Sequence, residues 1–280
     1  MGLKEILELI GFGFLIGSYG TLVGIGGGFL LVPFMLLFYQ TTPQQAAGTS
    51  LLVVFLNASS GTWAYIGQKR VDYKSAWRFS LATIPGAILG VYLSLYFTAQ
   101  SFRLVFGSLL LALSLFLAFK PSPGGENGHT FRVENPHSSH VKRDILNGQG
   151  VRHVYSFNEG MAILFSFFLG FFSSILGVGG GIIQVPALVY LFSFPTHIAT
   201  ATSQFILVFI TLWGTLFHGL VGNVLLAKAI PIGLGAILGA QLGAWIARRV
   251  RAPLILRLLS LALFIVGFRL LLGGLVWHRG

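Results

Sequence analysis

Long apolar segments separated by short polar breaks make up most of this 280-residue chain. Most of these segments approach the roughly 20 residues that an α-helix needs to cross a hydrocarbon layer of about 30 Å. The pattern therefore predicts about eight to ten helices. Their expected positions are residues 4–22, 27–39, 44–66, 76–97, 102–119, 157–175, 180–193, 197–218, 229–247 and 253–273.

Two of the expected helices, 27–39 and 180–193, are shorter than the others. At 1.5 Å per residue each has a length of only about 20 Å. Each follows a cluster of glycines, and each glycine in a helix costs about 1 kcal/mol relative to alanine. We expect two glycine-broken short helices, which either cross the membrane or turn back within it.

The two halves of the chain repeat one another. Residues 24–28 have the sequence Gly-Ile-Gly-Gly-Gly and precede Val32-Pro33, whereas residues 177–181 have the sequence Gly-Val-Gly-Gly-Gly and precede Val185-Pro186. The same offset, which carries Gly24 onto Gly177, also carries Thr49-Ser50 onto Thr202-Ser203. Several matches at one offset indicate an internal duplication.

The composition places this repeat in a membrane. Hydrophobic residues make up 55% of the chain and charged residues only 9%, against about 25% in soluble domains. The expected fold is an all-α integral membrane protein. The net charge of +11 is then a signal of membrane topology, and we expect no nucleic-acid partner.

A polar segment separates the halves. We expect residues 1–120 to form the first membrane repeat, 121–156 a polar cytoplasmic linker and 157–280 the second membrane repeat. The linker contains four histidines, His129, His137, His140 and His153. Their spacing is irregular, so we expect no metal site there.

The basic loops predict opposite orientations for the two halves. The loop after the third helix of the first half is basic, and the next loop contains only Arg103. In the second half the corresponding loop contains only Lys228, and the following one is basic. The basic residues are Lys69, Arg70, Lys74 and Arg78 in the first half, and Arg248, Arg249, Arg251 and Arg257 in the second. Since cytoplasmic loops collect lysine and arginine, the halves are expected to be inverted repeats with both termini outside.

The glycine clusters are the principal candidate for a binding site. A helix that begins after such a cluster presents unpaired N–H groups and the positive end of its dipole, which together attract an anion. Secondary transporters with inverted repeats bind substrate near the midplane, where interrupted helices meet. The alternative is close helix packing by small residues. A nucleotide loop is excluded, because the P-loop Lys-Ser/Thr ending and the dinucleotide spacing are absent.

Neutral polar residues accompany both clusters and could donate hydrogen bonds to an anion without burying a charge. Hydrogen bonding between helices is the alternative role for each of them. The candidate substrate-binding residues are Gly24, Gly26, Gly27, Gly28, Thr49, Ser50, Asn57, Gly177, Gly179, Gly180, Gly181, Gln184, Thr202, Ser203 and Gln204.

His218, near the end of the eighth helix, is a candidate for proton coupling, because histidine titrates near neutral pH. A polar residue at the membrane interface is the alternative. None of the seven acidic residues lies inside a long apolar segment, which argues against a cation transporter. The chain has no recognisable catalytic constellation or cofactor motif, so we expect neither an enzyme nor a cofactor.

The duplicated Gly-x-Gly-Gly-Gly segment followed by Val-Pro resembles the sulfite exporter family of TauE/SafE-like permeases. The resemblance covers both halves, with the motif on Gly24, Gly26, Gly27, Gly28 and Pro33, and its second copy on Gly177, Gly179, Gly180, Gly181 and Pro186. Membership implies transport of sulfite, sulfoacetate, thiosulfate or a related organosulfur anion. It also implies a bacterial or archaeal inner membrane.

The leading hypothesis is a secondary transporter that moves a small sulfur-containing anion by alternating access. Its expected partners are the small anionic substrate, membrane lipid and a proton as candidate coupling ion. A passive anion channel and a non-transporting membrane scaffold are the alternatives. Exact substrate, direction of transport and oligomeric state are left open by the sequence.

Overall fold

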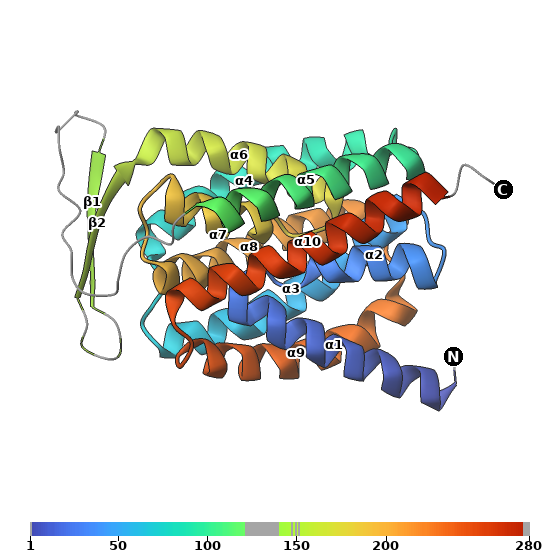
Figure 1. The fold of residues 1–280 in the computed structure, drawn as a ribbon, viewed down its shortest axis with the longest axis horizontal. Coiled ribbons are helices and arrows are strands. Elements are labelled where there is room, and N and C mark those ends of the chain that lie inside the picture. The colour runs from blue at the N-terminus through green and yellow to red at the C-terminus, as the bar shows by residue number, and fades with distance from the viewer. Residues whose placement is uncertain (1, 121–139, 147, 149, 151, 277–280) are drawn as a thin grey trace.

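The computed structural model describes residues 2–120, 140–146, 148, 150 and 152–276, and these form ten α-helices and one antiparallel β-hairpin (Figure 1). The first half contains α1 (Leu3–Val23), α2 (Gly28–Phe38), α3 (Pro43–Gly67), α4 (Tyr73–Ser94) and α5 (Ala99–Phe119). The hairpin consists of β1 (His140–Leu146) and β2 (Arg152–Asn158). The second half contains α6 (Glu159–Leu176), α7 (Gly181–Tyr190), α8 (Thr196–Leu220), α9 (Leu226–Ala247) and α10 (Ala252–Val276).

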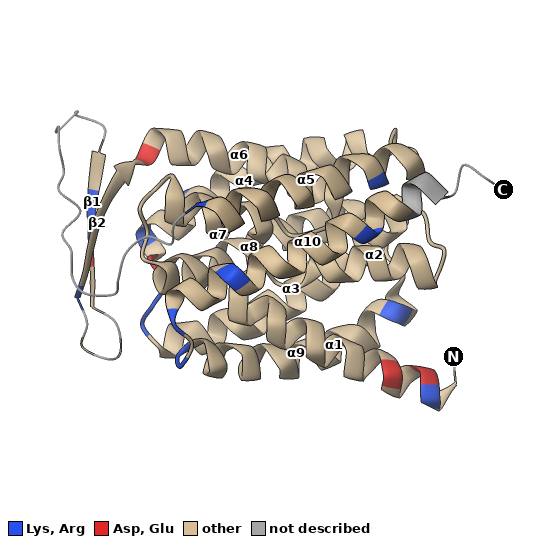
Figure 2. Cartoon of the chain, viewed as in Figure 1, with Lys and Arg blue, Asp and Glu red and all other residues tan. Residues whose placement is uncertain are grey.

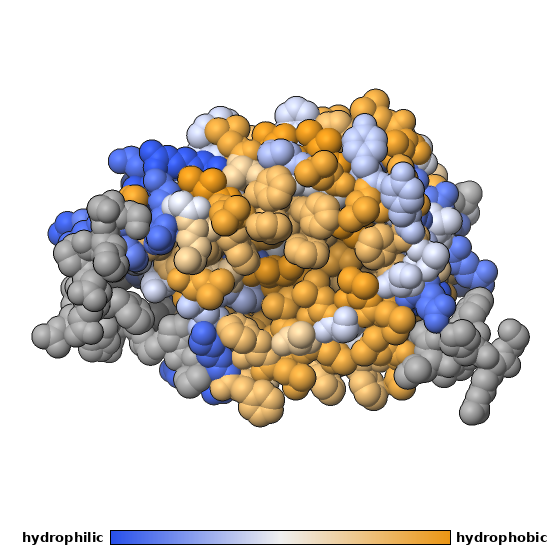
Figure 3. Space-filling model, turned by 90° about the horizontal axis from the view of Figure 1, so that it is seen from above, coloured by the Kyte–Doolittle hydropathy of each residue, from blue (hydrophilic) through white to orange (hydrophobic). Residues whose placement is uncertain are grey.

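Many large apolar side chains are exposed on the helices. Seven of the described helices are long and apolar enough to cross a membrane, and large side chains such as Leu15, Leu89 and Phe264 are exposed on them. Figure 3 shows a broad hydrophobic band between two hydrophilic ends. Lipid is the solvent that such a surface requires. The predicted multi-pass integral membrane protein is therefore confirmed.

The helix starts follow from local capping chemistry. Thr42 accepts a hydrogen bond from the Gln45 amide, and the Gln45 side chain in turn binds the Thr42 amide. Asp72 and Thr98 cap α4 and α5 in a similar way, which moves both starts about one turn ahead of their predicted positions. Side-chain oxygens at these positions satisfy the amides that a helix leaves unpaired at its N-terminus.

The two halves are arranged as inverted repeats. Helix α1 begins and α10 ends at one end of the molecule, and the hairpin lies at the other, so α1 and its counterpart α6 run in opposite directions (Figure 1). Helix α1 packs along α9, and its counterpart α6 packs along α4, the counterpart of α9. Helices α3 and α8 pack on each other, as do α5 and α10. Each of these helix pairs joins one helix from each half.

Glycines allow the closest of these helix pairs to form. A side chain at Gly17 of α1 would place its Cβ 2.6 Å from Ala236 Cα of α9. At the equivalent position in the second half, Gly170 of α6, the Cβ would lie 2.1 Å from the Thr83 carbonyl oxygen of α4. Small residues at such contacts let membrane helices approach backbone to backbone.

The hairpin was not foreseen from the sequence, which predicted only a polar linker in this region. Its register pairs His140 with Asn158 and His153 with Ile145, so the two described histidines lie at opposite ends of the ladder. His129 and His137 lie outside the described residues. Among the residues that the structure describes, no cluster of potential metal ligands occurs.

The hairpin is attached to one end of the helix bundle by a compact contact. Tyr155 and Phe157 are buried, and their rings pack against Phe194. Arg143 of β1 forms ion pairs with Asp72 at 3.6 Å and Glu159 at 3.0 Å. The hairpin therefore contacts residues of both halves.

Tyr155 donates a hydrogen bond of 2.7 Å to Asp72. Burial, together with the negative charge of Asp72, raises the pKa of the Tyr155 phenol above its ordinary value. The phenol therefore stays protonated and remains a donor to the carboxylate.

Candidate functional site

Two glycine segments, residues 24–28 and 177–181, interrupt the helical structure between the first and second helix of each half. Gly24, Gly26 and Gly27 have φ angles of 84°, 85° and 83°. Their counterparts Gly177, Gly179 and Gly180 have φ angles of 70°, 75° and 81°. Residues with a Cβ rarely adopt this left-handed conformation, which explains why glycine recurs at these positions. The glycines thus form the breaks themselves.

The short helices α2 and α7 begin at these breaks. Gly27 and Gly180 occupy the N-cap positions, and neither described N-terminus has a side chain that caps it. The first amides of a helix have no partner within that helix, so both N-termini present unpaired N–H groups. The predicted glycine-broken short helices are confirmed. From the region of the breaks, α2 extends toward the termini and α7 toward the hairpin (Figure 1).

The two glycine segments lie against the opposite half in a reciprocal manner. A Cβ on Gly24 would lie 2.7 Å from Thr200 Cα, and a Cβ on Gly177 would lie 2.3 Å from Ala47 Cα, the equivalent position in the first half. A Cβ on Gly28 would lie 3.0 Å from the Gly177 carbonyl oxygen. The structure therefore brings the two predicted clusters together at the interface between the halves.

Buried hydroxyls and one amide accompany this meeting point. The Ser203 hydroxyl donates to the Gly24 carbonyl at 2.9 Å and to Gln184 Oε1 at 3.3 Å. The Ser50 hydroxyl donates to the Gly28 carbonyl at 3.4 Å. All three side chains are buried. Ser50, Gln184 and Ser203 thus lie at the glycine segments, and Ser50 and Ser203 are related by the repeat offset.

Asn57 and Gln204 lie beside the last turn of α1. Asn57 Oδ1 accepts a hydrogen bond of 3.1 Å from the Thr21 hydroxyl, and Gln204 Nε2 donates one of 3.4 Å to the Gly20 carbonyl. Among the described residues, Asn57 Nδ2 and Gln204 Oε1 are buried without a hydrogen-bond partner. Buried polar atoms are ordinarily satisfied, so these two amides have capacity left for water or a ligand.

Thr49 and Thr202 form equivalent hydrogen bonds between the halves, which we call ties. The Leu225 amide donates to the Thr49 hydroxyl at 3.0 Å, and the Asp72 amide donates to the Thr202 hydroxyl at 3.1 Å. Each hydroxyl thus binds the start of a helix that belongs to the other half. Of the residues predicted to contact substrate, these two have their hydroxyls engaged by backbone amides.

His218 and Tyr65 form a second pair of equivalent ties. His218 Nε2 lies 3.1 Å from the Ser174 carbonyl, and Tyr65 donates to the Thr21 carbonyl at 2.8 Å. A carbonyl only accepts, so Nε2 carries the proton, and Nδ1 accepts from the Asn223 side chain at 3.4 Å. His218 is fully buried in the protein.

Thr21, Ser174 and Tyr65 also belong to this arrangement but were not among the predicted site residues. The repeat offset that carries Gly24 onto Gly177 also carries Thr21 onto Ser174 and Tyr65 onto His218. Identical residues reveal a repeat more readily than positions that differ in chemistry. Comparing positions rather than residue types would have found these pairs.

The described acidic side chains lie away from the meeting point of the glycine segments. The acidic residues that the structure describes are Glu5, Glu8, Asp72, Asp144 and Glu159, which lie at helix starts or in the hairpin. The meeting point itself combines neutral hydroxyls and amides with two helix N-termini. Helix N-termini carry a partial positive charge. The meeting point therefore has partial positive charge from its backbone.

Comparison with known proteins agrees with this architecture. The family model described as "Sulfite exporter TauE/SafE" matches residues 9–270. The chain is 35% identical over 276 residues to the probable membrane transporter protein YunE of Bacillus subtilis, which covers 95% of this chain and 97% of the relative.

More distant relatives cover most of the chain as well. A probable membrane transporter protein of Xylella fastidiosa is 29% identical over 90% of this chain and 88% of its own length. The probable membrane transporter protein MJ0441 of Methanocaldococcus jannaschii is 24% identical over 94% of both chains. No solved structure matches. Because the family model and these relatives span both halves and both glycine segments, the chain belongs to the sulfite exporter TauE/SafE family of membrane transporters.

Proposed function

We propose that this protein is a secondary transporter that moves a small sulfur-containing anion by alternating access. The observation that supports the proposal most strongly is the reciprocal meeting of the two glycine segments at the start of α2 and α7. Broken helices whose N-termini meet near the middle of an inverted repeat are typical of substrate sites in secondary transporters.

The anion is proposed to bind to the unpaired amides that follow Gly27 and Gly180. Asn57 Nδ2 supplies a free neutral donor, whereas Gln204 Oε1 is an acceptor that water can satisfy. The Ser50 and Ser203 hydroxyls, which donate to the Gly28 and Gly24 carbonyls in this structure, would turn toward the anion. Backbone amides at a helix N-terminus bind anions because the N–H groups and the helix dipole act together. The family name supports sulfite or a chemically related oxyanion as the substrate.

Alternating access is proposed to use the equivalent ties at the two ends of the molecule. The Tyr65–Thr21 and Asp72–Thr202 bonds connect elements near the hairpin end. The His218–Ser174 and Leu225–Thr49 bonds are their counterparts near the end that contains the termini. Because the two sets are related by the repeat, opening one while the other stays closed exchanges the accessible side.

The hairpin end is proposed to face the cytoplasm. Figure 2 shows that lysine and arginine gather at this end, whereas few lie at the end with the termini. Cytoplasmic ends of membrane proteins collect basic residues. This topology places both described termini outside and the hairpin in the cytoplasm.

The test of the proposed function is flux of radiolabelled sulfite into liposomes that contain the purified protein, with and without a pH gradient. Saturable flux, counterflow, and competition by sulfoacetate or thiosulfate but not by sulfate are expected. Flux without saturation or counterflow would indicate a passive channel. Folded protein that carries none of these anions would contradict the proposed substrate class and favour a scaffold.

His218 is the proposed site of proton coupling. The side chain neighbours Ser174, Asn223 and Gly48, and a proton added at Nδ1 would remove the acceptor of the Asn223 amide. Protonation would therefore break the contact with Asn223 while the Nε2 bond to the Ser174 carbonyl is kept. We expect His218→Gln to retain transport but to lose most of its dependence on pH between about 5 and 8.

The matched control for this variant is His197→Gln in the same helix, which is expected to keep the wild-type pH profile of sulfite uptake. An unchanged pH profile in folded His218→Gln protein would show that His218 only supports the structure, as Tyr65 does in the other half.

A further inference from the structure

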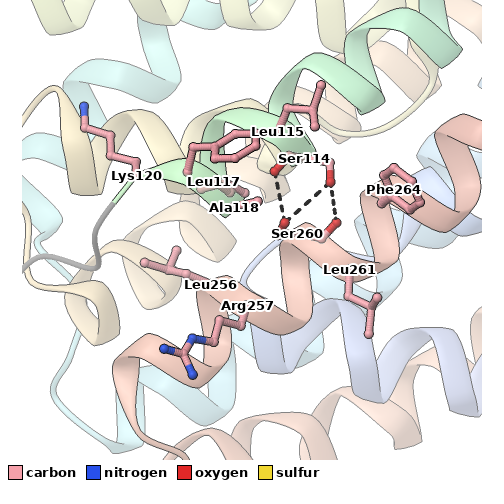
Figure 4. Close-up of a pocket in the computed structure, with 11 residues that line it drawn as sticks. Ser114, Leu115, Leu117, Ala118, Lys120, Leu256, Arg257, Ser260, Leu261 and Phe264 are labelled. Carbon is pink, nitrogen blue, oxygen red and sulfur yellow. Dashed lines mark hydrogen bonds between the residues drawn. The ribbon is translucent and has the colours of Figure 1, made fainter.

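A groove of about 610 Å³ lies between α5 and α10, well away in the sequence from the glycine segments (Figure 4). Its lining is mainly apolar and includes Leu117, Phe119, Leu256 and Phe264. The two helices are held together at its floor by reciprocal hydrogen bonds in which each of Ser114 and Ser260 donates to the carbonyl of the other, at 2.8 Å and 3.0 Å.

Two cations stand at the hairpin end of this groove. Lys120 follows the last residue of α5, and Arg257 lies in the second turn of α10 on the opposite rim (Figure 4). Neither forms a salt bridge with any carboxylate that the structure describes. The Lys120 ammonium lies 4.9 Å from the centres of the Phe116 and Tyr190 rings, which hold it at the rim.

Arg257 lies near the start of α10 on the rim of the groove. It follows the start of α10 by five residues, a rise of about 8 Å along the helix. Its neighbours in the groove are apolar, and its side chain is exposed on the surface that faces lipid. An arginine at this depth directs its guanidinium toward the interface, where lipid phosphates lie.

We propose that this groove binds an anionic phospholipid from the same leaflet as the hairpin. The acyl chain lies along the apolar lining. The side chains of Lys120 and Arg257 point away from one another in Figure 4, and both would turn toward a phosphate at the hairpin end of the groove. Arg248, Arg249 and Arg251 precede α10 at the same end and add to the positive field. Basic pockets between membrane helices on the cytoplasmic side suit anionic lipid headgroups, and arginine binds phosphate in a bidentate manner.

The test uses the thermal unfolding of the full-length protein in detergent with added phosphatidylglycerol or phosphatidylcholine. A ligand that binds the folded state raises the unfolding temperature, and we expect phosphatidylglycerol to raise it by about 5 °C more than phosphatidylcholine does. The double variant Lys120→Gln/Arg257→Gln is expected to lose this difference. Arg269→Gln, in the same helix near the opposite end, is the matched control and keeps it.

Two further arms separate the lipid from other occupants. Inorganic phosphate and sulfite are expected to give no stabilisation that depends on Lys120 and Arg257, and such an effect would indicate a site for a free anion instead. Native mass spectrometry should find phosphatidylglycerol retained by the wild type and by Arg269→Gln, with at least about tenfold less on the double variant.

Equal retention of both lipids by all three proteins would overturn the proposal. Loss of a dimer in the double variant, with no change in lipid retention, would overturn it as well, because the groove would then be occupied by a second copy of this chain. None of these readouts depends on transport, so the lipid proposal and the transport proposal can fail separately.

Discussion

Replacing Gly27 by valine is expected to abolish sulfite flux while leaving membrane insertion intact. Gly27 has a φ angle of 83°, and a Cβ there would lie 2.7 Å from the backbone carbonyl oxygen of Ile16. A β-branched residue in the left-handed region is strained by about 1–3 kcal/mol, and the carbonyl that it would meet is backbone and cannot rotate away. The N-terminus of α2 must therefore shift.

Gly180→Val tests the second half in the same way. Its φ angle is 81°, and the nearest atom to an added Cβ is Leu169 Cδ2 at 2.5 Å, the end of a side chain that can move. We expect a large but smaller loss of flux than for Gly27→Val. Radiolabelled sulfite uptake by equal amounts of reconstituted protein gives the comparison.

Gly222→Val is the matched control for both variants. Gly222 has a φ angle of 76°, so a valine there carries the same kind of backbone strain, but no atom lies within 4 Å of an added Cβ. Gly222 follows α8 and lies away from the meeting point of the glycine segments. We expect this variant to transport. Wild-type flux in folded Gly27→Val would contradict the proposed binding site, and loss of flux in Gly222→Val would show that backbone strain alone is sufficient.

Arg143→Ala is expected to lower the free energy of unfolding by about 3–5 kcal/mol, because it breaks a buried ion network. The Arg143 side chain is 12% exposed and lies between Asp72 and Glu159, which are 4% and 16% exposed. Its Nε also donates to the Ser75 hydroxyl at 3.1 Å. Removal of the guanidinium leaves two carboxylates with little solvent and a missing partner. Thermal unfolding in detergent, together with proteolysis of the hairpin, measures the effect.

Arg152→Ala provides the control on the same hairpin. Arg152 pairs with Asp144, but both side chains are largely in solvent, at 71% and 43% exposure. Exposed ion pairs contribute little to stability, so we expect almost no change in unfolding temperature. Similar destabilisation in the two variants would contradict the special role assigned to Arg143. Arg143→Lys is expected to rescue only in part, because a lysine cannot bind two carboxylates in the geometry of a guanidinium.

Much of the helix arrangement could be predicted from the sequence, because lipid imposes a simple relation between apolar length and span. The short helices were expected at 27–39 and 180–193 and occur at Gly28–Phe38 and Gly181–Tyr190. The starts of α4 and α5 were expected too late, because capping by Asp72 and Thr98 adds polar first turns that an apolar pattern does not include.

The hairpin escaped prediction for a related reason. The strand of residues 152–158 is short and contains Arg152, His153 and Asn158, so its polar residues were attributed to a linker. Its buried positions pack against residues far away in the sequence: Phe157 against Phe79 and Phe192, and Tyr155 against Phe194. A pattern within seven residues cannot indicate such a partner.

The candidate site was predictable in outline but not in detail. The repeat offset identified Ser50 and Ser203, which the structure places at the glycine segments. It identified Thr49 and Thr202 with equal strength, yet their hydroxyls bind the Leu225 and Asp72 amides. One position along a helix rotates a side chain by about 100°, so adjacent residues face different surroundings that only the packed structure reveals.

The pairing of α1 with α9 has a consequence for biosynthesis. Helix α1 is made long before the partner that covers its glycine face, because α9 is the ninth of the helices that the structure describes. Gly24 likewise has its closest neighbour at Thr200, on a segment made much later. A chain with so many contacts between distant residues folds late, since loop closure must precede the contacts that compensate for it. The nascent first half must therefore remain in the membrane with its broken helix uncovered until the second half emerges from the ribosome.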